Sequence, residues 1–287
     1  MKKKIYLSGW EVLLNNDMIC ENFVATHITD KKTATQLSVY IELIFEEGKL
    51  IKAHQYWGED KEERPIEEEE IGFSIPKYKR NKIVQFVKNE FGINQLGGEL
   101  PLDFKMPDNN CVVPFQYLGF IDNKDKQFNW LPFKLHLVCP IFLNFDKVFL
   151  DYSNPNYPIL INREEIEGLE TNEDNLNKET EIVYEKLRFN SADDGPYFGQ
   201  DIGHIISGGI PCWIQYPDVP VCPKSNKMMK FLCEMGSNEV LVKRSNVVPS
   251  KNEYCRSHKF LHFWGDGNLY VFFEPSSKVA CFIIQHT

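Results

Sequence analysis

The 287-residue sequence has no run of about 20 uncharged apolar residues, the length that a membrane-spanning helix needs. Its first ten residues carry positive charge but no long apolar segment, so we expect no signal peptide, no membrane contact and a cytoplasmic location. The eight cysteines stand singly and lie mostly in apolar runs, so we expect free, buried thiols in a reducing compartment. No Gly-x-Ser-x-Gly elbow, His-Glu-x-x-His pair or phosphate-binding loop is present.

The net charge of −9 makes nucleic acid an unfavoured partner, because phosphate binding depends on lysine and arginine. A basic or disordered protein partner suits this charge better. The acidic residues gather in Glu59–Glu70 and in Arg163–Asp174. The first run is explained by a solvated loop, and the alternative is a strip that docks a basic partner. The second run belongs to a segment that we expect to link two halves of the chain, and both runs would supply charges that steer a basic partner.

The segment Gly203–Gln215 is the centre of the pattern. Gly208 and Gly209 permit a tight turn, and Pro211 fixes an extended exit from it. An apolar run containing Trp213 follows and ends at Gln215. A proline-rich turn then leads to the predicted strand Met228–Met235, which completes a unit similar to a β-hairpin.

We predict an α+β fold of mostly antiparallel sheets with one or two packed helices. Residues 1–75 are expected to be β-rich, with a strand at Ile5–Leu7 and a hairpin of Gln36–Phe45 with Lys49–Trp57. The apolar spacing in Pro76–Phe91 predicts an amphipathic helix that ends at Gly92. A second helix is predicted for Leu176–Leu187, within an acidic connector of residues 161–196.

The remaining residues read as two similar halves, 76–160 and 197–287. The same order of features occurs in both: double glycine, proline, Pro-Asp, cysteine and apolar strand, from Gly97-Gly98 to Pro114–Ile121 and from Gly208-Gly209 to Lys230–Cys233. We therefore expect an internal duplication.

The combination Gly-Gly-x-Pro-x-Trp-x-Gln, Val-Cys-Pro and Trp264-Gly-Asp-Gly-Asn-Leu-Tyr-Val resembles the YwqG-like family of unknown function. The resemblance covers Gly203–Thr287 well and Phe91–Ser153 loosely. That family is distantly similar to the programmed-cell-death-2 proteins and a ribosome-biogenesis relative, which carry Cys-x-x-Cys where this chain has Cys222-Pro-Lys-Ser225. The resemblance implies paired halves and a role in protein binding, either as a client escort or as an immunity protein against a toxin.

Three constellations have the residue types for chemistry. Cys255, His258 and His262 have ligand-like spacing, but no second pair completes a zinc site, so we predict no metal and no cofactor. Ser207 with His204 and Asp201 offers the residues of a hydrolase, and this reading stays an alternative. RNA binding or processing is another alternative, although the charge opposes it. We assign no catalytic residue.

A junction between two halves commonly leaves a cleft, and clefts bind ligands. We expect an extended peptide or partner segment to bind there, because amides and aromatic faces grip a peptide without chemistry. The expected lining comprises Gln116, Trp213, Gln215, Trp264 and Asp266, with Gly97, Gly98, Gly208, Gly209 and Pro211 as turn residues. The oligomeric state stays open.

Overall fold

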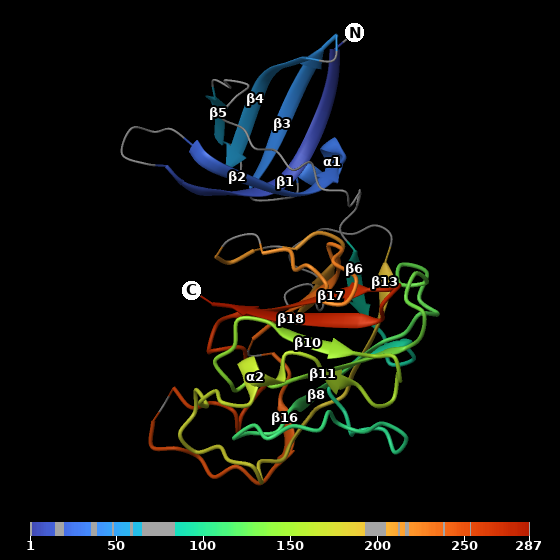
Figure 1. The fold of residues 1–287 in the computed structure, drawn as a ribbon, viewed down its shortest axis with the longest axis vertical. Coiled ribbons are helices and arrows are strands. Elements are labelled where there is room, and N and C mark those ends of the chain that lie inside the picture. The colour runs from blue at the N-terminus through green and yellow to red at the C-terminus, as the bar shows by residue number, and fades with distance from the viewer. Residues whose placement is uncertain are drawn as a thin grey trace. The chain divides into compact units, whose positions relative to one another are not determined.

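The computed structural model divides the chain into two compact units (Figure 1). The first comprises Met1–Ile83 with Gly209–Val219, and the second comprises Val84–Gly208 with Pro220–Thr287. The structure describes residues 2–14, 20–35, 39–47, 49–57, 60–64, 84–192, 205–211, 213–215, 218–237, 239–252 and 254–286. In these residues the strands pair antiparallel, and helix is confined to two four-residue elements. No helix in the described ranges is long and apolar enough to cross a membrane.

The first unit contains a five-stranded antiparallel sheet in the order β2-β1-β3-β4-β5. Its elements are β1 (Lys2–Leu14), β2 (Cys20–Thr29), α1 (Lys31–Ala34), β3 (Val39–Glu46), β4 (Lys49–Trp57) and β5 (Asp60–Arg64). The predicted hairpin is confirmed, because β3 pairs with β4 along its length. Glu47 takes the left-handed backbone angle of the tight turn, with φ of 49°.

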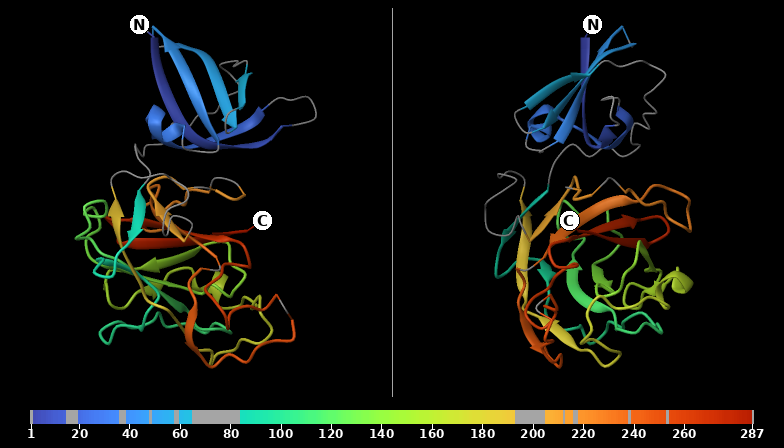
Figure 2. Two further views of the ribbon diagram at one scale, coloured as in Figure 1. Left: turned by 180° about the vertical axis from the view of Figure 1, so that it is seen from behind. Right: turned by 90° about the vertical axis from the view of Figure 1, so that its left-hand side faces the viewer.

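The second unit contains two larger sheets and one small one (Figure 2). The six-stranded sheet runs β11-β10-β18-β17-β15-β14, the five-stranded sheet β6-β13-β7-β8-β9, and the small sheet joins β12 to β16. Their bounds are β6 Gln85–Lys88, β7 Asn94–Leu96, β8 Gln116–Ile121, β9 Leu135–Cys139, β10 Val148–Asp151, β11 Ile159–Leu160, β12 Ile182–Tyr184, β13 Leu187–Ala192, β14 Ile206–Gly208, β15 Lys230–Gly236, β16 Val242–Ser245, β17 Asn268–Glu274 and β18 Val279–Gln285, with the helix α2 at Arg163–Ile166.

One hydrophobic core serves both large sheets of this unit. Leu96, Leu118 and Leu137 contribute from the five-stranded sheet, and Phe273 and Phe282 from the six-stranded sheet. Every residue of β8 and β9 is buried, including the polar Gln116 and His136, so these strands are covered on both faces.

The helix predicted for Pro76–Phe91 is wrong where the structure describes it. Residues 65–83 lie outside the described ranges, and Val84 onward forms a bridge and the strand β6. Burial alternates with a period of two: Val84 and Phe86 are 4% and 2% exposed, whereas Val87 is 44% exposed. Phe91, which the helical spacing counted as apolar face, is 91% exposed. Pairing with β13 decides the conformation.

The helix predicted for Leu176–Leu187 is also wrong. Ile182 and Tyr184 are buried and alternate with the half-buried Val183, which is the pattern of a strand. The strand β13 then lies inside the five-stranded sheet, between β6 and β7. The described part of the expected connector therefore contributes strands to the sheets. The helix that it contains is the single turn α2, which lies outside the segment predicted to be helical.

Two sets of three strands share one arrangement. β7-β8-β9 and β14-β15-β17 are each neighbours in that order, and all pairs are antiparallel. The register shifts at Leu118 in β8 and at Leu232 in β15, and both leucines are fully buried. The strand that follows each set pairs differently. β18 follows β17 in the chain and pairs with it, whereas β10 follows β9 in the chain but pairs with β18.

Candidate functional site

The most acidic described segment lies between Arg163 and Glu181, where eight residues are acidic and two are basic. It begins with α2 and ends at β12. We call its exposed carboxylates the acidic strip: Glu164, Glu165, Glu170, Asp174, Glu179 and Glu181.

The backbone of the strip is fixed to the second unit at several points. Ile166 and Leu176 are 1% and 7% exposed and belong to the core. Thr171 forms a bridge with Leu143, and the amide of Asn172 donates to the carbonyl of Phe142 at 2.9 Å. The exposed carboxylates therefore stand on an ordered backbone, which reduces the entropy lost on binding.

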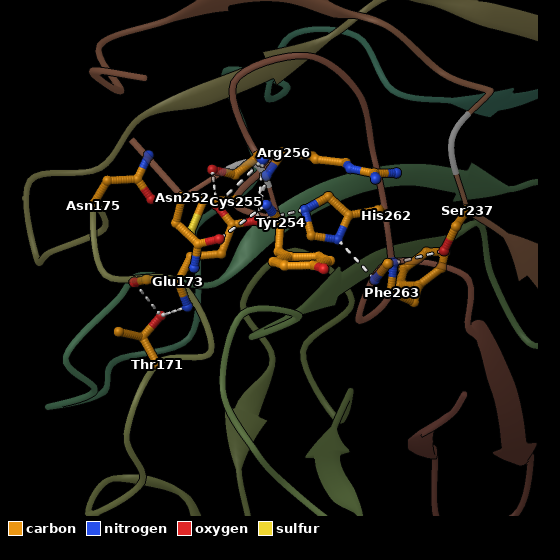
Figure 3. A network of polar contacts seen from close by, with 12 residues as sticks. Thr171, Glu173, Asn175, Ser237, Asn252, Tyr254, Cys255, Arg256, His262 and Phe263 are labelled. Carbon is orange, nitrogen blue, oxygen red and sulfur yellow. Dashed lines mark hydrogen bonds and ion pairs between the residues drawn. The ribbon is translucent and has the colours of Figure 1, made fainter. Parts of the chain in front are cut away.

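The strongest anchor is Glu173, whose side chain points inward and is 3% exposed (Figure 3). Its Oε1 accepts hydrogen bonds from the backbone N–H groups of Arg256 at 2.9 Å and Ser257 at 3.1 Å. Its Oε2 accepts one from the Ser257 hydroxyl. The Nε2 of His262 lies 2.7 Å from Oε1. One carboxylate thus joins the acidic segment to the loop that precedes β17.

His262 has a defined tautomer in this network. The N–H of Gly265 donates to Nδ1 at 3.3 Å, so Nδ1 is an acceptor and Nε2 carries the proton that faces Glu173. Nε2 lies only 2.7 Å from Oε1 of Glu173, yet the direction of the N–H does not satisfy a hydrogen bond. The contact is therefore an electrostatic one between the N–H dipole of a neutral ring and a carboxylate, and both side chains are only 3% exposed.

The environment of Glu173 keeps it ionised. Burial would raise its pKa, but the contacts from His262 and Ser257 and the backbone hydrogen bond from Arg256 outweigh burial, so its pKa lies below the usual value. With both oxygens occupied by donors, the carboxylate is suited to holding structure, and the Ser257 hydroxyl is engaged as a donor to it.

Several carboxylates of the strip remain open to a partner. Two carboxylates of the strip have partners within the chain, since Glu165 accepts a hydrogen bond from the Asn162 amide at 2.9 Å and Glu181 lies 3.7 Å from Arg244. Glu164, Glu170 and Glu179 form no ion pair within 4.0 Å among the described residues. The strip is therefore a negatively charged surface with little internal neutralisation.

The five residues predicted to line one cleft are divided between the two units. Trp213, 6% exposed, and Gln215, exposed, belong to the first unit. Gln116 belongs to the second unit, is 3% exposed, and donates from its amide to the carbonyl of Pro114 at 2.8 Å. Trp264 and Asp266 also lie in the second unit. The shared cleft stays a prediction.

Trp264 and Asp266 sit in a tight turn, as the sequence predicts. Trp264 has a φ of 58° and Gly265 one of 90°, which are left-handed angles. The Trp264 ring stacks on that of His286, with centroids 5.3 Å apart and planes 7° apart. Asp266 is exposed.

The predicted turn glycines separate into two kinds. Gly97, Gly98 and Gly209 have φ of 59°, 87° and 88°, as a turn requires. Gly208 instead ends β14 and pairs with Val84. Pro211 follows in the first unit.

The residues considered for chemistry have other partners. Ser207 donates its hydroxyl to Glu234 at 2.7 Å, and both side chains are buried, while His204 and Asp201 lie outside the described residues. Cys255 donates to Asp174 at 3.4 Å. Within the described ranges, no group of three or more His, Cys, Asp or Glu residues could hold a metal ion.

Glu173 and Ser257 were not predicted. They are 84 positions apart, and Ser257 lies between two of the ligand-like residues, Cys255 and His258, without being one of them. The only signal for Glu173 is its place inside an acidic run, which does not distinguish it from its exposed neighbours.

Comparison with known proteins leaves the site to be interpreted from its geometry, since no family model, curated protein or solved structure matches this chain.

Proposed function

We propose that this chain is a protein-binding module of the YwqG-like kind that takes a basic protein partner on the acidic strip. The partner would be a client chain that is escorted or a toxin that is neutralised. The observation that carries the proposal is the combination of exposed carboxylates with a fixed backbone at residues 164–181.

Electrostatic attraction supports this reading. Charged surfaces raise association rates with oppositely charged partners, and the effect falls with ionic strength because the screening length is about 8 Å at physiological salt. The net charge of −9 adds a long-range field of the same sign. The acidic run Glu59–Glu70 was predicted to be a loop, but its described part, Asp60–Arg64, is the strand β5, which pairs with β4. The rest of that run lies outside the described residues, so the described strip carries the argument.

We further propose that the second unit arose by internal duplication within an α+β family. The matched order of β7-β8-β9 and β14-β15-β17 supports it, as do the register shifts at two buried leucines, Leu118 and Leu232.

The first test is capture of partners by the tagged full-length protein from its own cell extract, with and without RNase. We expect one stoichiometric basic protein that survives RNase. A partner lost with RNase would favour RNA binding, and an acidic partner would contradict the proposal.

The second test measures the association rate of that partner at increasing salt. The variant Glu164→Gln/Glu170→Gln/Glu179→Gln is expected to bind about tenfold more slowly at low salt and to show a weaker salt dependence. The control Glu46→Gln/Glu47→Gln/Glu90→Gln removes the same charge from exposed positions outside the strip. Equal loss in both variants would show that net charge acts and the strip does not.

A further inference from the structure

A polar, tyrosine-rich face covers the middle of the first unit's sheet. It consists of Tyr6 from β1, Tyr40 and Glu42 from β3, and His54 and Tyr56 from β4. Glu42 is the cross-strand partner of both Tyr6 and His54, and Tyr40 is that of Tyr56. Side chains at directly paired positions share a face, so these five residues form one surface, which we call the tyrosine face.

Glu42 is the charged centre of the tyrosine face and is 5% exposed. The Nδ1 of His54 lies 3.1 Å from its Oε2, and the Tyr6 hydroxyl donates to its Oε1 at 3.1 Å. Burial would raise the pKa of Glu42, but the hydrogen bonds from Lys4, His54 and Tyr6 outweigh it and lower the pKa. A nearly buried carboxylate anion therefore lies on this sheet.

The last donor to this carboxylate is a lysine ammonium group. Nζ of Lys4 donates to Oε1 of Glu42 at 2.8 Å. The two ends differ in exposure, because the side chain of Lys4 is 51% exposed and that of Glu42 is 7% exposed. All three donors stand on strands of the sheet, but Lys4 reaches the carboxylate through a long four-carbon side chain. A second ammonium group would give the buried carboxylate the same hydrogen bond, and the released Lys4 would remain solvated, so this donor can be exchanged without leaving Glu42 unpaired.

The aromatic rings beside Glu42 suit a cation. Tyr40 and Tyr56 stack with centroids 4.5 Å apart and planes 4° apart, and they pack against Ala34 and Ile210 of the same unit. Tyr6 and Tyr56 remain half-buried, so part of their surface is accessible. Electron-rich aromatic faces attract ammonium groups, and the attraction adds to that of a carboxylate.

We propose that the tyrosine face binds the ammonium group of a lysine side chain from a partner protein, and that Lys4 occupies this place in the unbound chain. The partner's lysine would take over the hydrogen bond to Oε1 of Glu42 and release Lys4 to solvent. The basic partner is taken from the proposed function, whereas the site itself rests on the contacts of the first unit.

The contacts also predict selectivity among cations. Oε1 accepts a hydrogen bond from an N–H group, so a primary ammonium fits and a trimethylated ammonium, which has no N–H group, does not. A guanidinium prefers both oxygens of a carboxylate, and Oε2 is already in contact with His54. We therefore expect lysine to bind better than trimethyl-lysine or arginine.

The experiment uses the full chain and the peptide acetyl-Gly-Lys-Gly-amide, with the trimethyl-lysine, arginine and methionine peptides as comparisons. NMR signals of the tyrosine rings report binding. The variant Lys4→Met removes the internal competitor, and we expect saturable binding of the lysine peptide in the millimolar range, at least about tenfold tighter than in the unchanged chain. Lys3→Met is the matched control, because it removes the same charge from the adjacent position of β1, whose side chain points to the other face.

The result that overturns the proposal is equal affinity for all four peptides, or equal affinity in Lys4→Met and Lys3→Met. No binding to Lys4→Met would also overturn it. Adding Glu42→Gln to Lys4→Met should abolish binding, with circular dichroism to verify the fold. Should that double variant unfold, Tyr6→Phe in the Lys4→Met background replaces it, because it removes one hydroxyl and keeps the ring.

Failure of this site and failure of the proposed function give different results. The variant Glu164→Gln/Glu170→Gln/Glu179→Gln changes only the second unit, so it should leave binding of the lysine peptide unchanged. Conversely, if association with the partner depends on salt but the lysine peptide does not bind, the acidic strip remains supported as a binding surface and the tyrosine face does not.

Discussion

Replacing Glu173 should show how much of the second unit's stability depends on one inward-facing carboxylate. Glu173→Ala leaves the N–H groups of Arg256 and Ser257 and the Ser257 hydroxyl without their acceptor, and it removes the carboxylate beside Nε2 of His262. Each buried donor left unsatisfied costs about 1–3 kcal/mol, although water entering the space recovers part of it. We expect a loss of about 3–5 kcal/mol in the free energy of unfolding.

Urea unfolding followed by far-ultraviolet circular dichroism and tryptophan fluorescence measures this loss. A loss of this size moves the midpoint by about 1–2 M if the slope with urea is unchanged. Glu170→Ala is the control, because Glu170 lies in the same segment and is exposed. The control should stay within about 0.5 kcal/mol of the unchanged chain. If both variants unfold at the same midpoint, Glu173 does not anchor the loop and the reasoning fails.

The same residue makes a prediction about pH. The folded-state pKa of Glu173 is lowered, so its contribution to stability is present above the unfolded pKa of about 4.3 and is lost as the pH falls through the folded pKa. Glu173→Gln keeps the shape and removes the titration. The stability difference between the unchanged chain and Glu173→Gln should therefore be full near pH 7 and shrink below about pH 4. A difference that is independent of pH would contradict the assignment.

Two further predictions concern the second unit. Gly119→Ala should destabilise the fold by more than about 2 kcal/mol in urea unfolding, because φ is 118° and a Cβ would meet the carbonyl oxygen of Gln95 at 2.1 Å. The control Gly168→Ala, whose Cβ would have nothing within 4 Å, should change the free energy of unfolding by less than about 1 kcal/mol. Similar losses in the two variants would contradict the close approach at Gly119. His136 should stay neutral in NMR titration down to nearly its pKa of about 4, since burial and Lys134 lower that pKa. Because His136 takes up its proton more readily in the unfolded chain, the free energy of unfolding should fall as the pH drops from about 6.5 toward 4. Titration of the His136 ring near pH 6.5 in the folded protein would refute this.

Local signals in the sequence predicted the local features of the fold. The hairpin of β3 and β4 follows from two apolar runs separated by a short turn, and β1 contains the predicted strand Ile5–Leu7. Gly97, Gly98 and Gly209 take the left-handed angles expected of paired glycines. Each of these features depends on residues close together in the chain, so the sequence contains the relevant information.

The two predicted helices failed for one reason. A spacing of apolar residues describes one segment alone, whereas Phe86 and Ile182 are placed by strands that come from elsewhere in the chain. β6 pairs with β13, and β12 pairs with β16, so sheet pairing overrode a weak helical pattern. Phe91 illustrates the error, because the helical spacing placed it toward a core and the structure exposes it.

The acidic run Arg163–Asp174 shows where a candidate site can be predicted and where it cannot. Its composition predicted an exposed, charged connecting segment that attracts a basic partner, but composition treats Glu170, Glu173 and Asp174 alike. The fold separates them, since Glu173 turns inward to His262 and its neighbours stay exposed. The inward residue holds the backbone on which the outward ones stand. Removing Glu173 should therefore act through stability, whereas neutralising Glu164, Glu170 and Glu179 should slow association and leave unfolding nearly unchanged.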